Sequence, residues 1–129
     1  MKKVSFDFDS TLSTKEVQEF AKELISKDIE VHIVTSRFEN HPKSKSFNNV
    51  DVFSVAKSIG ISICNIHFMN MLDKFEFFEK NSDFLFHLDD DFIEIELIQE
   101  HCSNIHGICL DLQPNWKDLC NNSLKKIKI

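Results

Sequence analysis

Two short groups of acidic residues are each associated with an apolar stretch of the sequence. Asp7 and Asp9 lie at the end of the first apolar stretch, and Asp89 and Asp90 directly follow a later one. Like charges held close together are costly unless a cation or a proton offsets them. Mg²⁺ prefers oxygen ligands, usually one or two carboxylates together with water and substrate phosphate. If the two groups meet in the fold, the sequence predicts a magnesium site lined by aspartates.

Groups suited to holding a phosphate lie elsewhere in the chain. Thr35 and Ser36 follow another apolar stretch, and Lys74 lies between this stretch and the second acidic group. A hydroxyl can bind a phosphoryl oxygen through a hydrogen bond, and a lysine through its charge. Lys80 is the alternative to Lys74 if the helix near these lysines is placed later in the sequence. We therefore expect Thr35, Ser36 and Lys74 to bind phosphate.

The elements that must position these residues alternate between β and helical character, which is typical of a parallel sheet covered by crossover helices. The stretch after Asp91 fits either a strand or a helix, and the alternation favours a helix. We expect strands at 4–8, 31–34, 61–68, 84–88 and 105–112, and helices at 50–59, at 71–80 and after a capping box of Ser13 and Glu16. The expected fold is one α/β domain over residues 1–129, a three-layer, doubly wound, mainly parallel five-stranded sheet. Ligands bind outside the carboxyl ends of the strands in such a sheet, where the residues named above lie.

The composition excludes several classes of protein. The chain has 129 residues but only 2 Gly, and a dinucleotide fingerprint or a P-loop needs more glycines within a tight window. The formal charge of −6 argues against a surface that coats nucleic acid. No apolar run approaches the roughly 18 residues that a membrane span needs, and the four cysteines form no C-x-x-C pair. We expect a cytoplasmic protein with reduced, mostly buried thiols and no membrane partner.

Taken together, the motifs resemble those of the haloacid dehalogenase (HAD) superfamily, chiefly Mg²⁺-dependent phosphatases with a Rossmannoid sheet. The resemblance implies that Asp7 is the nucleophile and Asp9 the general acid and base. It also implies that Asp90 binds the metal with Asp7 and the main-chain carbonyl of Asp9, and Asp89 is the alternative within its pair. The matching segments follow the family order over nearly the whole chain: Phe6-Asp7-Phe8-Asp9-Ser10-Thr11-Leu12, then Thr35, Lys74 and Asp89-Asp90.

The chemistry implied by this resemblance is phosphomonoester hydrolysis. A carboxylate nucleophile forms an aspartyl phosphate, which divides one difficult hydrolysis into two easier displacements. Asp9 would protonate the leaving alkoxide and then deprotonate the attacking water. Family members that cleave haloacids lack this second aspartate because they have no alkoxide to protonate. Asp9 therefore favours a phosphatase.

The loop after Thr35 and Ser36 is expected to overhang the site. It contains Arg37, Lys43 and Lys45 in an otherwise acidic protein. Cations bind phosphates and aromatic rings stack on bases, so this loop suggests a nucleotide or a nucleic-acid end as substrate. The span between the second and third motifs leaves no room for a cap domain. Family members without a cap accept bulky substrates or close their sites as oligomers, which makes a homo-oligomer an alternative.

A response-regulator receiver domain, or a phosphate-binding module without catalysis, is the competing interpretation. A receiver has similar length, an acid pair, a phosphorylated aspartate, a hydroxyl residue and a lysine. Chain order separates the two, because receivers have the acid pair after the first strand and the lysine near the end. Here the Asp7-x-Asp9 pattern comes first and the adjacent aspartates follow Lys74.

Overall fold

The computed structural model describes residues 1–39 and 49–125. Five strands alternate with five helices in the described chain. In order these are β1 (Lys3–Phe6), α1 (Lys15–Ser26), β2 (Glu30–Thr35), α2 (Val50–Ile59), β3 (Ile66–Phe68), α3 (Phe75–Lys80), β4 (Phe84–Asp89), α4 (Phe92–His101), β5 (His106–Cys109) and α5 (Trp116–Leu124). Two short turns complete the path, η1 (Phe8–Leu12) after β1 and η2 (Ile63–Asn65) before β3.

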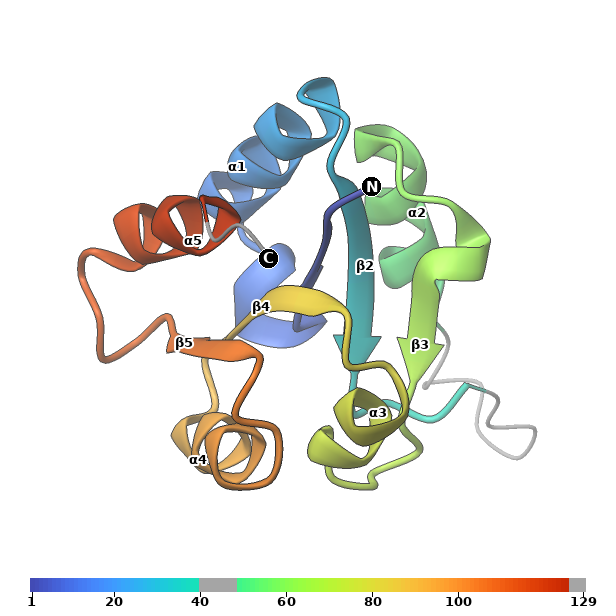
Figure 1. Ribbon diagram of the computed structural model, residues 1–129. Helices are drawn as coiled ribbons and strands as arrows, with labels where there is room; N and C mark the ends of the chain where they lie inside the picture. Colours follow the sequence, from blue (N-terminus) through green and yellow to red (C-terminus); the bar gives the residue numbers. More distant parts are fainter. Residues whose placement is uncertain (40–48, 126–129) are drawn as a thin grey trace.

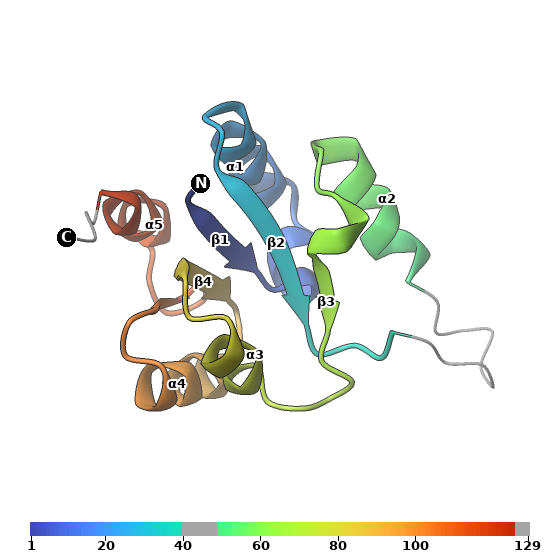
Figure 2. The same ribbon diagram turned by 45° about the vertical axis from the view of Figure 1, so that its right-hand side comes forward.

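The strands form one sheet in the order β3-β2-β1-β4-β5, with every pairing parallel. Helices α1, α2 and α5 cover one face and α3 and α4 cover the other (Figures 1 and 2). The predicted three-layer α/β sheet of five strands is therefore confirmed. The chain first adds β2 and β3 on one side of β1 and then places β4 and β5 on the other side. The order thus changes direction between β1 and β4, which is where sheets of this kind bind ligands.

Two apolar clusters hold the helices against the sheet. On the first face, Phe20 of α1 packs edge-on against Phe6 of β1 and Trp116 of α5, with ring centroids 6.3 and 5.5 Å apart. Trp116, which is buried, thus anchors the C-terminal segment to the sheet layer. On the second face, Phe78 of α3 packs against Phe84 of β4. Burial of each such aromatic side chain contributes about 1.5–3 kcal/mol, so both helix layers are fixed firmly enough to position the strand ends.

Several predicted boundaries differ from the structure. The capping box is wrong: Thr14 precedes the first residue of α1 and no side chain caps the helix, while the Ser13 hydroxyl accepts the Ser10 N–H at 3.0 Å. Strand β3 is shorter than predicted because the Ser62 hydroxyl accepts the Cys64 N–H and starts the turn η2. The stretch after Asp91 is helical as expected, and this carboxylate accepts two N–H groups of the first turn.

The remaining differences shorten the other elements. Helix α3 begins at Phe75, four residues later than predicted, and β5 covers His106–Cys109 alone. The C-terminal segment forms the nine-residue helix α5. Gly60 follows α2 with φ 93° and provides a left-handed cap. No described helix combines the length and the apolar character needed to cross a membrane.

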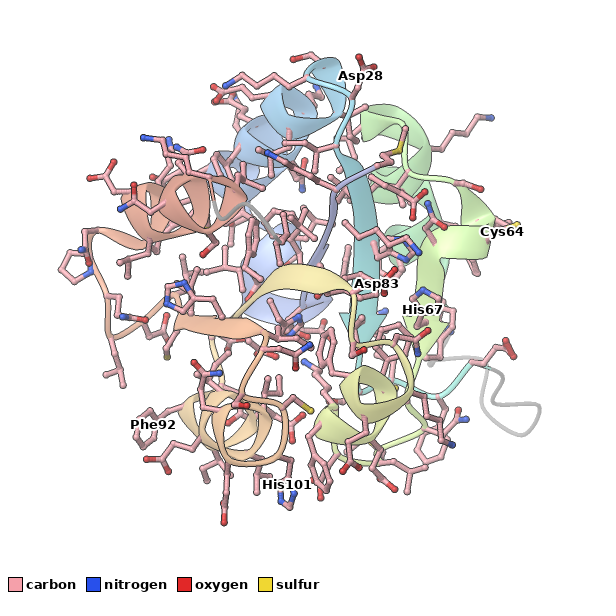
Figure 3. All side chains as sticks on the ribbon, viewed as in Figure 1. Asp28, Cys64, His67, Asp83, Phe92 and His101 are labelled. Atoms are coloured by element: carbon pink, nitrogen blue, oxygen red, sulfur yellow. The ribbon has the colours of Figure 1, made fainter. Side chains whose placement is uncertain are left out.

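A pair of histidines joins β2 and β3. His32 Nδ1 lies 2.9 Å from His67 Nε2, and His32 Nε2 lies 2.6 Å from the Glu30 carboxylate. His32 is buried, whereas His67 is half-buried on β3, the outermost strand of the sheet (Figure 3). Burial and the neighbouring His32 lower the pKa of His67 to about 4.

Candidate functional site

The two acidic groups meet at the carboxyl edge of the sheet. Asp7 follows β1 and Asp89 ends β4, and these neighbouring strands are held together there by the Asp7 N–H, which donates to the Leu88 carbonyl at 2.9 Å. Asp90 follows directly. One carboxylate oxygen from each of the three aspartates lies within 4.8 Å of the others. Parallel strand ends thus bring together carboxylates that are more than 80 residues apart in sequence.

Lys74 lies inside this acidic group. Its side chain is 2% exposed, and its Nζ donates to Asp7 Oδ1 at 2.8 Å and to Asp89 Oδ2 at 2.5 Å. The residue precedes α3, and its main-chain N–H donates to the Glu94 carboxylate of α4. The alternative lysine, Lys80, is exposed at the end of α3. The structure therefore brings Lys74, and not Lys80, to the carboxylates.

The charges of this group are unevenly balanced. Burial, opposed by Lys74 and reinforced by the Asp89 charge, raises the pKa of Asp7 to about 8. Burial also acts on Asp89, but hydrogen bonds and charges from His87 and Lys74 outweigh it and keep the pKa of Asp89 below its usual range. The pKa of Lys74 is raised, because the two carboxylates outweigh the effect of burial. Three aspartates thus share one lysine, an arrangement that would be relieved by a further cation.

A buried histidine supports Asp89 from behind. His87 Nε2 lies 2.9 Å from Asp89 Oδ2, and His87 Nδ1 lies 2.8 Å from the Ser5 hydroxyl. The contact of this buried strand residue with Asp89 was not predicted. The signal was present in the sequence, because residues two apart in a strand point to the same face.

The turn η1 carries another residue that was not predicted. The Thr11 hydroxyl is buried, donates to Asp90 Oδ1 at 3.2 Å and lies 3.5 Å from Asp7 Oδ2. It reaches both carboxylates because the backbone turns sharply, with Asp9 extended and Ser10 at φ 58°. That left-handed conformation favours glycine, and a serine adopts it here. Thr11 thus links the two acidic groups.

Asp9 does not lie in the buried group. Its side chain is 58% exposed and forms a two-pronged ion pair with Arg37, with nitrogen–oxygen distances of 2.9 and 2.7 Å. The same guanidinium binds Asp51 of α2 at 2.7 and 2.8 Å and lies over the Phe8 ring. The Asp9 carboxylate is thus exposed and outside the set of three that could share a metal.

The other predicted phosphate-binding residues lie at the end of β2. Thr35 is buried and its hydroxyl accepts the Arg37 N–H at 3.3 Å, while the Ser36 carbonyl accepts the Met71 N–H at 2.7 Å. These contacts tie the segment after β2 to the segment after β3. Lys43 and Lys45 of the predicted substrate loop lie outside the described residues.

The donor set of the buried group fits a hard divalent cation. Asp7, Asp89 and Asp90 offer oxygen ligands, the type that Mg²⁺ prefers, and their charges exceed that of the lysine between them. No known family model matches the sequence, and no curated protein shows significant similarity to it. The functional assignment therefore depends on the chemistry of the site.

Proposed function

We propose that this protein is a Mg²⁺-dependent phosphomonoester hydrolase that acts through an aspartyl phosphate, with the chemistry of the HAD superfamily. The observation that carries the proposal is the group formed by Asp7, Asp89, Asp90 and Lys74 at the switch point of the sheet. A carboxylate beside a lysine and two further carboxylates is suited to attack on a phosphoryl group that a cation neutralises in part.

In the first step, a carboxylate oxygen of Asp7 attacks phosphorus. The new bond joins this oxygen to phosphorus, and the bond from phosphorus to the ester oxygen breaks. The proton of Asp9 goes to the leaving alkoxide, which departs as an alcohol. Lys74 holds a phosphoryl oxygen by its charge, and the Thr35 and Ser36 hydroxyls hold others through hydrogen bonds.

In the second step, Asp9 accepts a proton from water, and the water oxygen bonds to phosphorus. The bond between phosphorus and Asp7 breaks, which releases phosphate and restores the carboxylate. Asp9 must reach the leaving oxygen for both steps, so its ion pair with Arg37 has to rearrange or move with it. Mg²⁺ held by Asp7, Asp90 and Asp89, with the Asp9 main-chain carbonyl as the family ligand, would supply charge neutralisation for the anionic substrate.

The competing interpretation as a receiver domain is disfavoured by the topology. Receiver domains have the strand order 2-1-3-4-5, whereas this sheet has the order β3-β2-β1-β4-β5. A phosphate-binding module without catalysis has the same charge requirements as a phosphatase. Only turnover separates these two functions.

We further propose that the enzyme has no cap domain and acts in the cytoplasm on a nucleotide or a nucleic-acid end. Between β2 and α3 the described residues form α2, η2 and β3, with no cap domain among them. A site without a cap would accept a bulky substrate, or a second copy of the chain would close it in a homo-oligomer. The basic loop residues Lys43 and Lys45, together with Arg37, are the expected contacts for substrate phosphates.

The test is phosphate release from an aryl phosphate, followed by a screen of nucleoside monophosphates, 3′-phosphate ends, sugar phosphates and phosphopeptides. We expect turnover that requires Mg²⁺, stops with EDTA and is abolished in Asp7→Asn. Asp28→Asn is the matched control, because this exposed residue lies in the turn after α1, at the opposite edge of the sheet (Figure 3). Stable phosphorylation without turnover, or phosphate binding alone, would contradict the proposal.

A further inference from the structure

We propose that His87 is a positioning residue of this site. With its proton on Nε2 and its Nδ1 bonded to Ser5, it fixes the Asp89 carboxylate in the orientation that Lys74 and a bound cation require. The consequence for catalysis rests on the proposed phosphatase function. The positioning itself concerns the folded protein and can be tested without turnover.

The geometry forms a continuous chain of polar groups beneath the site. Ser5 and His87 are register partners on the adjacent strands β1 and β4, and His87 in turn reaches Asp89 on its own strand. All three residues are 0% exposed. Asp89 then accepts the ammonium of Lys74, which also reaches Asp7. The chain therefore runs from the interior of the sheet to the predicted nucleophile.

The hydrogen-bonding partners determine where the proton of His87 lies. Asp89 Oδ2 already accepts from Lys74, and a carboxylate only accepts hydrogen bonds when it is ionised, so His87 Nε2 must be the donor. The Ser5 hydroxyl has one proton and two acceptors within reach, His87 Nδ1 at 2.8 Å and the Phe86 carbonyl at 3.5 Å. A neutral imidazole carries one proton, so with this proton on Nε2 the bare Nδ1 accepts and the Ser5 hydroxyl donates to it.

This arrangement restrains both oxygens of Asp89. Oδ2 accepts from His87 and Lys74, while Oδ1 accepts the Asp91 N–H at 3.0 Å. Without the His87 donor, Asp89 Oδ2 would accept from Lys74 alone. The carboxylate could then rotate, and Lys74 and the cation ligands would lose their common geometry. Comparable supporting contacts at metal sites change metal affinity or activity by about 10- to 100-fold when removed.

Packing alone does not account for a histidine at this position. The His87 ring lies against Phe78, with centroids 5.2 Å apart, so an apolar side chain would satisfy the same neighbour. Burial of a polar ring costs free energy unless its nitrogens are hydrogen-bonded. Both nitrogens have partners here, and one partner is a carboxylate of the candidate site. A histidine at this position can therefore bond to Ser5 through one ring nitrogen and to Asp89 through the other.

The test compares His87→Leu, which has no donor, with His87→Gln, whose amide nitrogen can take the place of Nε2. His32→Leu is the control, because His32 is also a buried strand histidine bonded to a carboxylate, but its hydrogen bonds go to Glu30 and His67. Mn²⁺ binding by calorimetry is measured for each protein, together with kcat and KM for an aryl phosphate. We expect about 10- to 100-fold weaker Mn²⁺ binding and a similar fall in kcat for His87→Leu, with recovery in His87→Gln and no change in His32→Leu.

Nitrogen NMR of the wild-type protein tests the same inference without a variant or a metal. We expect the ring proton of His87 on Nε2 alone, and a mixture of the two tautomers in Ser5→Ala, the milder variant to use if His87→Leu does not fold. A proton on Nδ1 of the wild-type ring overturns the inference, as does wild-type Mn²⁺ affinity in His87→Leu. Absence of turnover in the wild type contradicts the phosphatase proposal instead, and the NMR result still decides the role of His87.

Discussion

Replacement of Lys74 by methionine tests the electrostatic balance of the site most directly. The substitution keeps most of the side-chain volume but removes the ammonium that lies 2.8 Å from Asp7 and 2.5 Å from Asp89. We expect Lys74→Met to lower the free energy of unfolding substantially and to abolish phosphatase activity. The loss of stability follows because the buried, ionised Asp89 carboxylate would lie beside Asp7 without the lysine that balances its charge.

The magnitude follows from the distances. At an effective dielectric constant of about 20, two unit charges separated by the 2.5 Å between Lys74 and the ionised Asp89 attract by about 7 kcal/mol. Removal of the ammonium also removes its own desolvation cost of several kcal/mol. Deletion of one partner of a buried ion pair typically lowers the free energy of unfolding by about 3–5 kcal/mol in total. For a chain of 129 residues this corresponds to a fall in Tm of roughly 10–20 °C.

Urea and thermal unfolding in EDTA measure this effect without a contribution from bound metal. Lys80→Met is the matched control, because Lys80 is exposed at the end of the same helix, and we expect a change within about 0.5 kcal/mol. Adding Asp7→Asn to Lys74→Met removes one of the unpaired carboxylates. We expect this double variant to recover a large part of the lost stability, which a double-mutant cycle quantifies.

Two results would refute this reasoning. A change below about 1 kcal/mol in Lys74→Met would mean that the ammonium contributes little beyond its desolvation cost. A double variant less stable than Lys74→Met would mean that Asp7 is not destabilised by its neighbours. Either result would also remove the electrostatic reason for placing a second cation among the three aspartates.

Three further predictions concern the surroundings of the site. Ser10→Gly should change the free energy of unfolding by less than about 1 kcal/mol, because relief of the left-handed backbone strain is offset by a more flexible unfolded chain. Ser10→Val should lower the free energy of unfolding by about 1–2 kcal/mol in urea, because a β-branched side chain disfavours this left-handed conformation. The pKa of His67 is about 4 in the folded protein and near 6.5 when unfolded. The unfolded chain therefore binds more protons between these values, and stability should fall as the pH is lowered from 6.5 to 4, by about 1–2 kcal/mol after allowance for partial exposure. The loss between pH 7.5 and 4.5 should be smaller in His67→Gln than in the wild type, because the lowered pKa of His32 contributes in both proteins. Arg37→Met should lower kcat for an aryl phosphate, because the Asp9 carboxylate would no longer be held by the guanidinium. The free energy of unfolding should change by less than about 1 kcal/mol, because the substitution breaks only exposed ion pairs. An unchanged kcat would mean that Arg37 does not position Asp9.

The placement of Asp7, Asp89 and Thr35 at the sheet edge could be predicted from the sequence because of a general rule of parallel sheets. The sequence shows which residues follow apolar stretches, and crossover connections bring the carboxyl ends of parallel strands to one edge. Boundaries of short elements were less predictable. Local hydrogen bonds, such as those of Ser13 and Ser62, overrode the patterns that favoured a capping box and a longer strand.

By itself, the sequence thus determined the alternation of elements and the residue types at the strand ends, since periodicity and chain order are properties of the sequence alone. Only the tertiary structure decided which groups touch. It placed Lys74 between two aspartates, turned Asp9 outward to Arg37 and brought His87 behind Asp89. These contacts depend on side-chain directions and burial across strands and helices that are distant in the chain. The charge balance of the site also depends on the tertiary structure, because the pKa of Asp7 is set by desolvation and by neighbours that meet it only in the folded protein.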